Sequence, residues 1–263
     1  LAGLQQTLDR DDYAGGEPYA LTLFSAAGAL LMIMAADTLA LFVGLEIASL
    51  SVYALVGLRR NRSESNEGLF KYFVMGAVFS AVFLYGAALT YGATGSTHLG
   101  VEPLAERSSL LLLGQTLMIV GLLFKVGVVP FHFWSPDAYT GAPAAVTGFM
   151  GAVIKIGGFA ALGAIWLNLA AVLSHHHPGG VLALDAVVIV TADAAEKLQP
   201  ATLIFLVLAV VSIVIGNFSA LRQTCARRLI AYSSVAHAGY MLLALPLTLG
   251  AAHVTSTLHL GSL

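Results

Sequence analysis

The chain has 263 residues, of which 58% are hydrophobic and only 10% are Asp, Glu, Lys or Arg. A soluble domain usually carries about 25% charged residues, so this composition indicates a membrane protein. The net charge of -2 gives no reason to expect nucleic-acid binding, and the single cysteine, Cys225, excludes an internal disulfide and a cysteine-rich metal or iron–sulfur site. No dinucleotide or phosphate-loop fingerprint is present, so we expect no cofactor, no metal and no redox centre within this chain.

Seven apolar stretches are each long enough, or nearly so, to cross a bilayer core. They cover residues 20–36, 38–58, 69–91, 108–129, 144–170, 200–221 and 229–249. The sequence therefore predicts an all-α membrane protein, a polytopic helical bundle that forms one transmembrane domain over residues 1–263. Because the chain begins at Leu1 rather than at a methionine, and residues 251–263 resemble the start of another span, we expect a fragment or an incomplete gene model.

The region between the fifth and sixth spans is harder to assign. It contains three adjacent histidines, His175 to His177, followed by the apolar run Val181 to Val190. That run is too short to span a bilayer and is better interpreted as an interfacial or re-entrant segment. Three adjacent histidines in regular structure cannot all face one ion, so a metal site there is not expected.

The charges of the loops predict an orientation. Two basic loops, Arg59 to Arg62 and Arg222 to Arg228, fall on the same side of the membrane when seven spans alternate, as does the loop 131–143. The opposite loops carry acidic residues, namely Glu102, Glu106, Asp185, Asp193 and Glu196. By the positive-inside rule the arginine-rich loops are expected in the cytoplasm, which for a bacterial protein means the inner membrane.

The fourth span is predicted to be a broken helix. Pro130 has no N–H, so the carbonyl of Val126 loses its helical partner. An unsatisfied backbone group in hydrocarbon costs several kcal/mol, so such a break persists only where protein or a water-filled cavity surrounds it. Lys125 lies about one turn before the proline. The less specific interpretation is a proline kink whose lysine reaches the headgroups.

Three charged residues fall inside predicted spans: Glu46, Lys125 and Lys155. A lysine at the bilayer centre costs about 2.5 to 3.5 kcal/mol on insertion scales, so all three are expected to face the protein interior. Small or polar neighbours within about one turn agree with this, namely Ser49, Gly121, Gly151 and Gly158. A static buried ion pair would explain one acid and one base, but not the second lysine or the broken helix.

These charges suit a proton relay. Burial favours the neutral form of a lysine and a nearby carboxylate favours the charged form, so a change in the glutamate's influence lets a lysine release its proton. His132 and His237 could extend the relay, because histidine titrates near neutral pH. For His132 an aromatic loop contact is an equal alternative, and for His237 a packing or hydrogen-bonding role is favoured.

Four segments resemble one known family. FVGLEIASLSVYALVG, EGLFKYFVMGAVFSAVFLYGAALTYGATGS, FKVGVVPFHFWSPDAYTGAPAAVTGFM and GNFSALRQTCARRLIAYSSVAHAGY are similar, in consistent order, to the antiporter-like subunits of proton-pumping NADH:quinone oxidoreductase, respiratory complex I. The second and third segments are most similar to its subunit N group. The resemblance runs from about Leu21 to Leu249.

The resemblance implies a fold and roles for residues. The family has two inverted five-helix repeats, each with a discontinuous helix, so residues 20–170 would form the first repeat and 200–263 an incomplete second one. Glu46 matches the family's glutamate before the first broken helix, Lys125 its broken-helix lysine, and Lys155 its central-axis lysine. The second broken helix is expected beyond Leu263, so this piece alone should not pump.

The resemblance also implies partners. Neighbouring membrane subunits and the lipid bilayer are expected, with NADH, flavin, iron–sulfur clusters and quinone bound elsewhere in the complex. Two alternatives remain open: a subunit of a multisubunit cation/proton antiporter, and a membrane scaffold whose buried charges only hold helices together.

Overall fold

The computed structural model describes residues 2–10, 15–101, 103–104, 107–173 and 192–260. Within these ranges every regular element is a helix, and the elements follow one another in this order: α1 Ala2–Arg10, α2 Glu17–Met34, α3 Thr38–Val56, α4 Ser63–Thr94, α5 Ser108–Val126, α6 Ser135–Gly141, α7 Ala144–Phe149, the π-helical turn η1 Met150–Ile154, α8 Lys155–Leu173, α9 Ala192–Leu221 and α10 Ala226–Leu260. The predicted all-α class is confirmed.

Seven helical segments are long and apolar enough to cross a membrane, which is the number predicted. The span predicted over 69–91 is part of α4, which runs from Ser63 to Thr94, and the span predicted over 229–249 is part of α10, which runs from Ala226 to Leu260. Residues 251–260 therefore continue α10, and the prediction that another span starts there is wrong. The polar first turns of α4 continue the helix beyond the apolar core. His175 to His177 and the run Val181 to Val190 lie outside the described residues.

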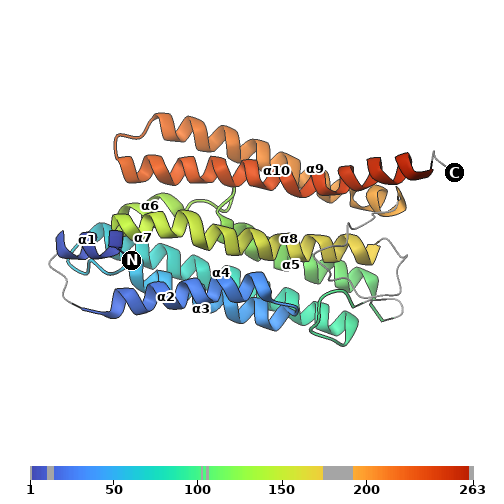
Figure 1. Ribbon diagram of the computed structural model, residues 1–263, viewed down its shortest axis with the longest axis horizontal. Coiled ribbons are helices and arrows are strands. Elements are labelled where there is room, and N and C mark those ends of the chain that lie inside the picture. The colour runs from blue at the N-terminus through green and yellow to red at the C-terminus, as the bar shows by residue number, and fades with distance from the viewer. Residues whose placement is uncertain (1, 11–14, 102, 105–106, 174–191, 261–263) are drawn as a thin grey trace.

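The helices run side by side along the long axis of the molecule (Figure 1). Helices α2 and α3 pack against each other on one side, α4 packs on α5, and the α9–α10 hairpin lies on the opposite side. Helix α10 contacts α6 and α8, so the hairpin rests on the helices that follow the predicted break. The helices that follow the predicted break therefore lie where the first five spans meet the last two.

Small residues let several helices approach closely. A Cβ added to Gly28 in α2 would lie 2.5 Å from the backbone nitrogen of Ala48 in α3, and one added to Gly216 in α9 would lie 2.7 Å from that of Ala236 in α10. Backbone contact of this kind is typical of helix pairs in membranes, where packing rather than hydrophobic burial drives association.

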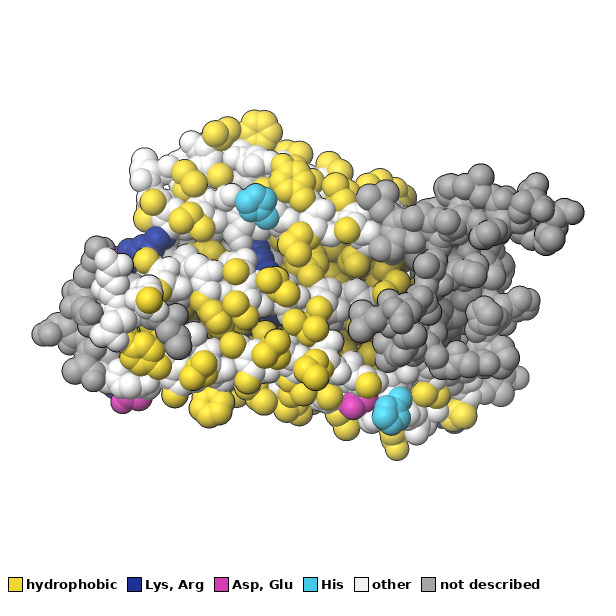
Figure 2. Space-filling model, viewed as in Figure 1, with side chains coloured by type: hydrophobic (Ala, Val, Ile, Leu, Met, Phe, Trp, Pro, Cys, Tyr) yellow, Lys and Arg dark blue, Asp and Glu magenta, His cyan; other side chains and the backbone are white. Residues whose placement is uncertain are grey.

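Large apolar side chains cover much of the outer surface (Figure 2). Examples are Leu23 and Phe24 on α2, Phe70 on α4 and Phe218 on α9, all exposed. A water-soluble monomer rarely carries contiguous apolar surface of this extent, so these faces suit hydrocarbon or another apolar protein surface. The chain is a multi-pass membrane protein.

Candidate functional site

The predicted helix break is present, but Gly127 rather than Pro130 ends the helix. Helix α5 stops at Val126, and Gly127 takes the left-handed conformation with φ 73° and ψ 45°. Its N–H donates to the carbonyls of Leu123 and Phe124, which is how a glycine closes a helix C-terminus. Residues 127–134 are non-helical. The helix in the fourth span is therefore broken as predicted, while the predicted span end at residue 129 is too late because Gly127 already ends the helix.

Protein groups, not lipid, satisfy the freed backbone. The N–H of Val129 donates to Ser212 Oγ of α9 at 2.9 Å, and the indole N–H of Trp134 donates to the carbonyl of Phe124 at 3.1 Å. An interrupted helix at membrane depth requires such partners. The break is therefore built into the protein interior and is tied to the second half of the chain through α9.

Lys125 is buried at the end of α5, with only 3% of its surface exposed. Its Nζ donates to Ser49 Oγ of α3 at 2.6 Å and lies 5.9 Å and 5.8 Å from the ring centres of Tyr53 and Tyr72. Two aromatic faces at such distances stabilise a cation that has lost its water. On the other side, a Cβ added to Gly158 of α8 would lie 3.7 Å from Lys125 Cγ. Lys125 thus lies between α3, which carries Glu46, and α8, which carries Lys155.

Glu46 lies on the same face of α3 as Ser49 and is half-buried. Its carboxylate accepts a hydrogen bond from Ser80 Oγ of α4. Among the described residues no ion pair joins Glu46 to either buried lysine. The static ion pair considered from the sequence is therefore not formed, and the hydrogen-bond partner of Lys125 on α3 is Ser49 rather than Glu46.

Lys155 is also buried, at 6% exposed, and begins α8 directly after the π-helical turn η1. Its Nζ donates to the backbone carbonyl of Ser234 in α10 at 2.5 Å. The hydroxyl of Ser234 lies 3.3 Å from the hydroxyl of Tyr139 in α6. This lysine therefore joins α8 to α10, the last described helix. Isolated π-helical turns within α-helices are frequent at functional sites.

The two histidines occupy different surroundings. His132 lies in the non-helical segment, half-buried, with its ring 6.5 Å from that of Tyr232, and its Nδ1 has no hydrogen-bond partner among the described residues. His237 is exposed on α10 beside Tyr240, with ring centres 6.2 Å apart. A relay role for either one stays a prediction.

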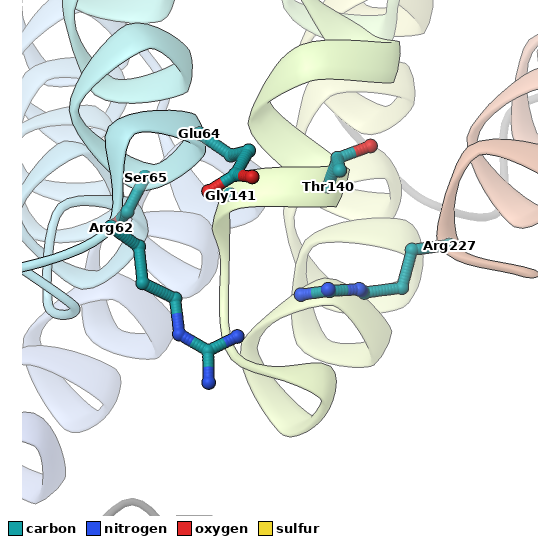
Figure 3. A pocket seen from close by; sticks show the side chains of 6 residues that line it. All are labelled: Arg62, Glu64, Ser65, Thr140, Gly141 and Arg227. Atoms are coloured by element: carbon teal, nitrogen blue, oxygen red, sulfur yellow. The ribbon is translucent and has the colours of Figure 1, made fainter. Parts of the chain in front are cut away.

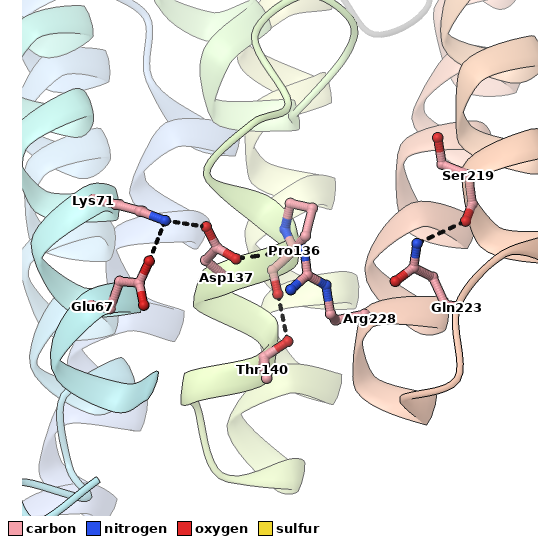
Figure 4. Close-up of polar contacts among 8 residues, drawn as sticks. All are labelled: Glu67, Lys71, Pro136, Asp137, Thr140, Ser219, Gln223 and Arg228. Carbon is pink, nitrogen blue, oxygen red and sulfur yellow. Dashed lines mark hydrogen bonds and ion pairs between the residues drawn. The ribbon is translucent and has the colours of Figure 1, made fainter. Parts of the chain in front are cut away.

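Ion pairs hold the short helix α6 that follows the break (Figure 4). Asp137 accepts from Lys71 of α4 at 2.7 Å and lies 3.8 Å from Arg228 of α10, and Lys71 also pairs with Glu67. Partly exposed pairs contribute about 0 to 1 kcal/mol each, so this cluster orients α6 more than it stabilises the fold.

Several polar residues of the site were not singled out from the sequence, namely Tyr53, Tyr72, Ser80, Tyr139 and Ser234. Tyr53 could have been found, because it follows Glu46 and Ser49 at seven and four residues and so shares their helical face. The others come from different helices, and only the packed structure brings them to the lysines. No cluster of three or more metal-ligating side chains occurs within the described ranges.

The arrangement defines a class before any comparison: a polytopic bundle with a discontinuous helix, two buried lysines and a half-buried glutamate between its helices. The family model described as "NADH:quinone oxidoreductase/Mrp antiporter, TM" matches residues 35–192 and 169–260. The chain belongs to this family of antiporter-like membrane subunits.

Individual proteins are similar to this chain over most of its length. The chain is 40% identical over 243 residues to NADH-quinone oxidoreductase subunit N of Trichlorobacter lovleyi, an alignment that covers 90% of this chain and 45% of the relative. The chain therefore spans about half the length of that relative. A solved structure of respiratory complex I from Thermus thermophilus contains a chain with 39% identity and a TM-score of 0.71, covering 93% of this chain and 48% of the other.

The fold also occurs in a more distant protein. A chain in the Mrp complex of a Dietzia species is 22% identical, with a TM-score of 0.69, over 86% of this chain and 39% of that chain. The same helical arrangement thus occurs in both kinds of assembly.

Proposed function

We propose that this chain is part of a proton-translocating membrane subunit of NADH:quinone oxidoreductase, and that Glu46, Lys125 and Lys155 carry the proton relay. The observation that supports this most directly is the position of Lys125 Nζ, buried at the broken helix between the helices of Glu46 and Lys155. The electron-transfer chemistry, with NADH, flavin, iron–sulfur clusters and quinone, would belong to other subunits. The similarity of this chain to an NADH-quinone oxidoreductase subunit N and to a chain of respiratory complex I supports that assignment.

The relay would work through the balance of charge around Lys125. The nearby carboxylate of Glu46 favours the protonated lysine, while burial favours the neutral one. A change in the charge felt at Glu46 would release the proton from Lys125 toward Lys155 across the contact at Gly158. Internal water would have to bridge the two lysines, because no described side chain joins their amino groups by hydrogen bonds.

The partners would be neighbouring membrane subunits and lipid. The exposed apolar faces of α2, α4 and α9 offer the surface that both require. Nothing in the charge of the chain favours nucleic acid as a partner.

A cation/proton antiporter subunit is the second candidate, because the family description and the fold of the Mrp chain include it. Proton uptake by sealed vesicles that hold the assembled complex, driven by NADH and quinone, separates the two. We expect uptake that is unchanged when sodium is replaced by potassium. Uptake that needs sodium and proceeds without NADH would favour the antiporter.

Glu46→Gln should slow proton transfer while leaving the fold intact. Glutamine keeps an oxygen that can accept from Ser80 Oγ, so the contact between α3 and α4 is preserved. It removes the negative charge that supports the protonated Lys125, and we expect about a tenfold loss of pumping rate, equivalent to roughly 1.4 kcal/mol. Ser80→Ala is the matched control, because it removes the hydrogen bond and keeps the charge. Full pumping by Glu46→Gln, with a loss in Ser80→Ala, would show that the hydrogen bond, not the charge, matters.

The proposed cytoplasmic side of the arginine-rich loops can be tested with the native Cys225. This residue directly precedes α10, and the backbone N–H groups of Arg228 and Arg227 hold the pKa of its thiol below the ordinary value. A lower pKa means more thiolate at neutral pH. A membrane-impermeant maleimide should therefore react faster with Cys225 than with a cysteine whose thiol has the ordinary pKa.

We expect this labelling in inside-out membrane vesicles and not in right-side-out ones. Cys225→Ser should remove the signal in both preparations. Labelling confined to right-side-out vesicles would reverse the proposed orientation.

A further inference from the structure

A small cavity opens at the end of the bundle that carries the basic loops, where three helix ends meet (Figure 3). It measures about 90 Å³ and is lined by Arg62, Glu64, Ser65, Thr140, Gly141 and Arg227. These residues come from the start of α4, the end of α6 and the start of α10. None of them contacts Lys125, Lys155 or Glu46 through a hydrogen bond, so the cavity is separate from the proposed relay.

Close backbone contact fixes one wall of the cavity. A Cβ added to Gly141 would lie 2.6 Å from the carbonyl oxygen of Glu64, so α6 ends directly against the first turn of α4. One turn further along, Gly68 of α4 meets the carbonyl of Asp137 in the same way, at 2.7 Å. One wall of the cavity is therefore backbone held in place by the contact between α6 and α4.

The free hydrogen-bond donors around this space are two guanidinium groups. Arg227 uses its Nη1 to donate to the carbonyl of Ala142 at 3.1 Å, which aims the group at the cavity and leaves its other N–H groups available. The guanidinium of Arg62 has neither a hydrogen bond nor an ion pair with any described residue. Figure 3 shows the two groups reaching from opposite sides toward the turn after Gly141. The hydroxyl of Thr140 donates to the carbonyl of Pro136 and that of Ser65 to the carbonyl of Val56, so neither hydroxyl is free to donate to a ligand in the cavity.

We propose that this cavity binds the phosphodiester headgroup of an anionic lipid. Planar guanidinium groups match the oxygens of a phosphate, and a pair of them can hold it from two sides. The two arginines and Glu64 together carry one net positive charge, which balances the single negative charge of a phosphodiester better than the double charge of free phosphate.

The position of the cavity also favours a lipid. It lies at the ends of two membrane-crossing segments, Ser63–Thr94 and Ala226–Pro246, where headgroups are found. Leu229 and Ile230, within one turn of Arg227 on α10, are exposed, so apolar side chains that lipid can cover lie close to this end of the helix. Basic pockets between spanning helices on the cytoplasmic side are typical sites for anionic headgroups.

The test uses the full-length subunit within its complex, purified in detergent and washed free of lipid. Binding of phosphatidylglycerol is measured by native mass spectrometry and by titration with a fluorescent phosphatidylglycerol, with phosphatidylcholine and inorganic phosphate as competitors. Arg62→Gln is the main variant, because the side chain has no partner whose loss would disturb folding. Arg60→Gln, exposed in the same loop and outside the cavity, is the matched control.

We expect Arg62→Gln to weaken the site about tenfold, and Arg62→Gln combined with Arg227→Gln to remove one bound phosphatidylglycerol per complex. Arg60→Gln should bind as the unmodified protein does, and phosphatidylcholine should compete poorly. Unchanged phosphatidylglycerol binding in Arg62→Gln would overturn the proposal. Displacement of the lipid by inorganic phosphate at a similar concentration would equally overturn it in favour of a free-anion site.

Discussion

Lys125→Met should abolish proton transfer through this subunit while the complex still assembles. Methionine fills a similar volume in the pocket between Tyr53, Tyr72 and Gly158, and it removes a charge that is costly to bury. Ser49 Oγ keeps its own donor bond to the carbonyl of Leu45, so no buried donor is left without a partner. We therefore expect unfolding temperatures close to those of the unmodified complex, and proton transfer through this chain that is slower by roughly a hundredfold or more.

Two further variants make this prediction specific. Lys125→Arg keeps the positive charge, yet guanidinium stays protonated and cannot hand a proton on, so it should fail as methionine does. Lys71→Met removes a lysine from a surface ion pair and should leave pumping nearly unchanged. The measurement is proton uptake per NADH oxidised in vesicles that hold the assembled complex, with assembly checked by native electrophoresis. Full proton yield from an assembled Lys125→Met complex would reduce this lysine to a structural residue.

The number of spans and the inward placement of Lys125 and Lys155 could be predicted because both follow from the cost of transfer into hydrocarbon. An apolar run of suitable length has to cross, and a charge within it has to face protein. The broken helix could be predicted on the same grounds. The residue that ends it was not predicted, because Gly127, two residues after Lys125, takes the left-handed conformation before the chain reaches Pro130.

The partners of the lysines could not be predicted, since they depend on packing between distant segments. Ser49 and Lys125 are 76 residues apart in sequence, and Lys155 and Ser234 are 79 apart. The π-helical turn before Lys155 also has no sequence signature, because it results from one extra residue fitted into an otherwise regular helix. The division into a first repeat over 20–170 and a partial second over 200–263 stays a prediction.

Lys155 allows the relay to be separated from a purely structural connection between the two halves of the chain. Its amino group donates to the carbonyl of Ser234 and so ties α8 to α10. If that tie were its whole role, Lys155→Met would lower thermal stability and assembly, and Lys155→Arg, which can still donate to a carbonyl, would restore both together with pumping. If Lys155 transfers protons, both variants should assemble and both should slow pumping by roughly a hundredfold or more, because neither can accept and release a proton at neutral pH. Tyr139→Phe removes the neighbouring hydroxyl contact with Ser234 and serves as a control, with little effect on pumping expected.

The decisive measurement is the number of protons pumped per NADH oxidised by the assembled Lys155→Arg complex. A full proton yield would show that Lys155 only connects α8 to α10. A reduced yield with normal thermal stability would place Lys155 on the proton path.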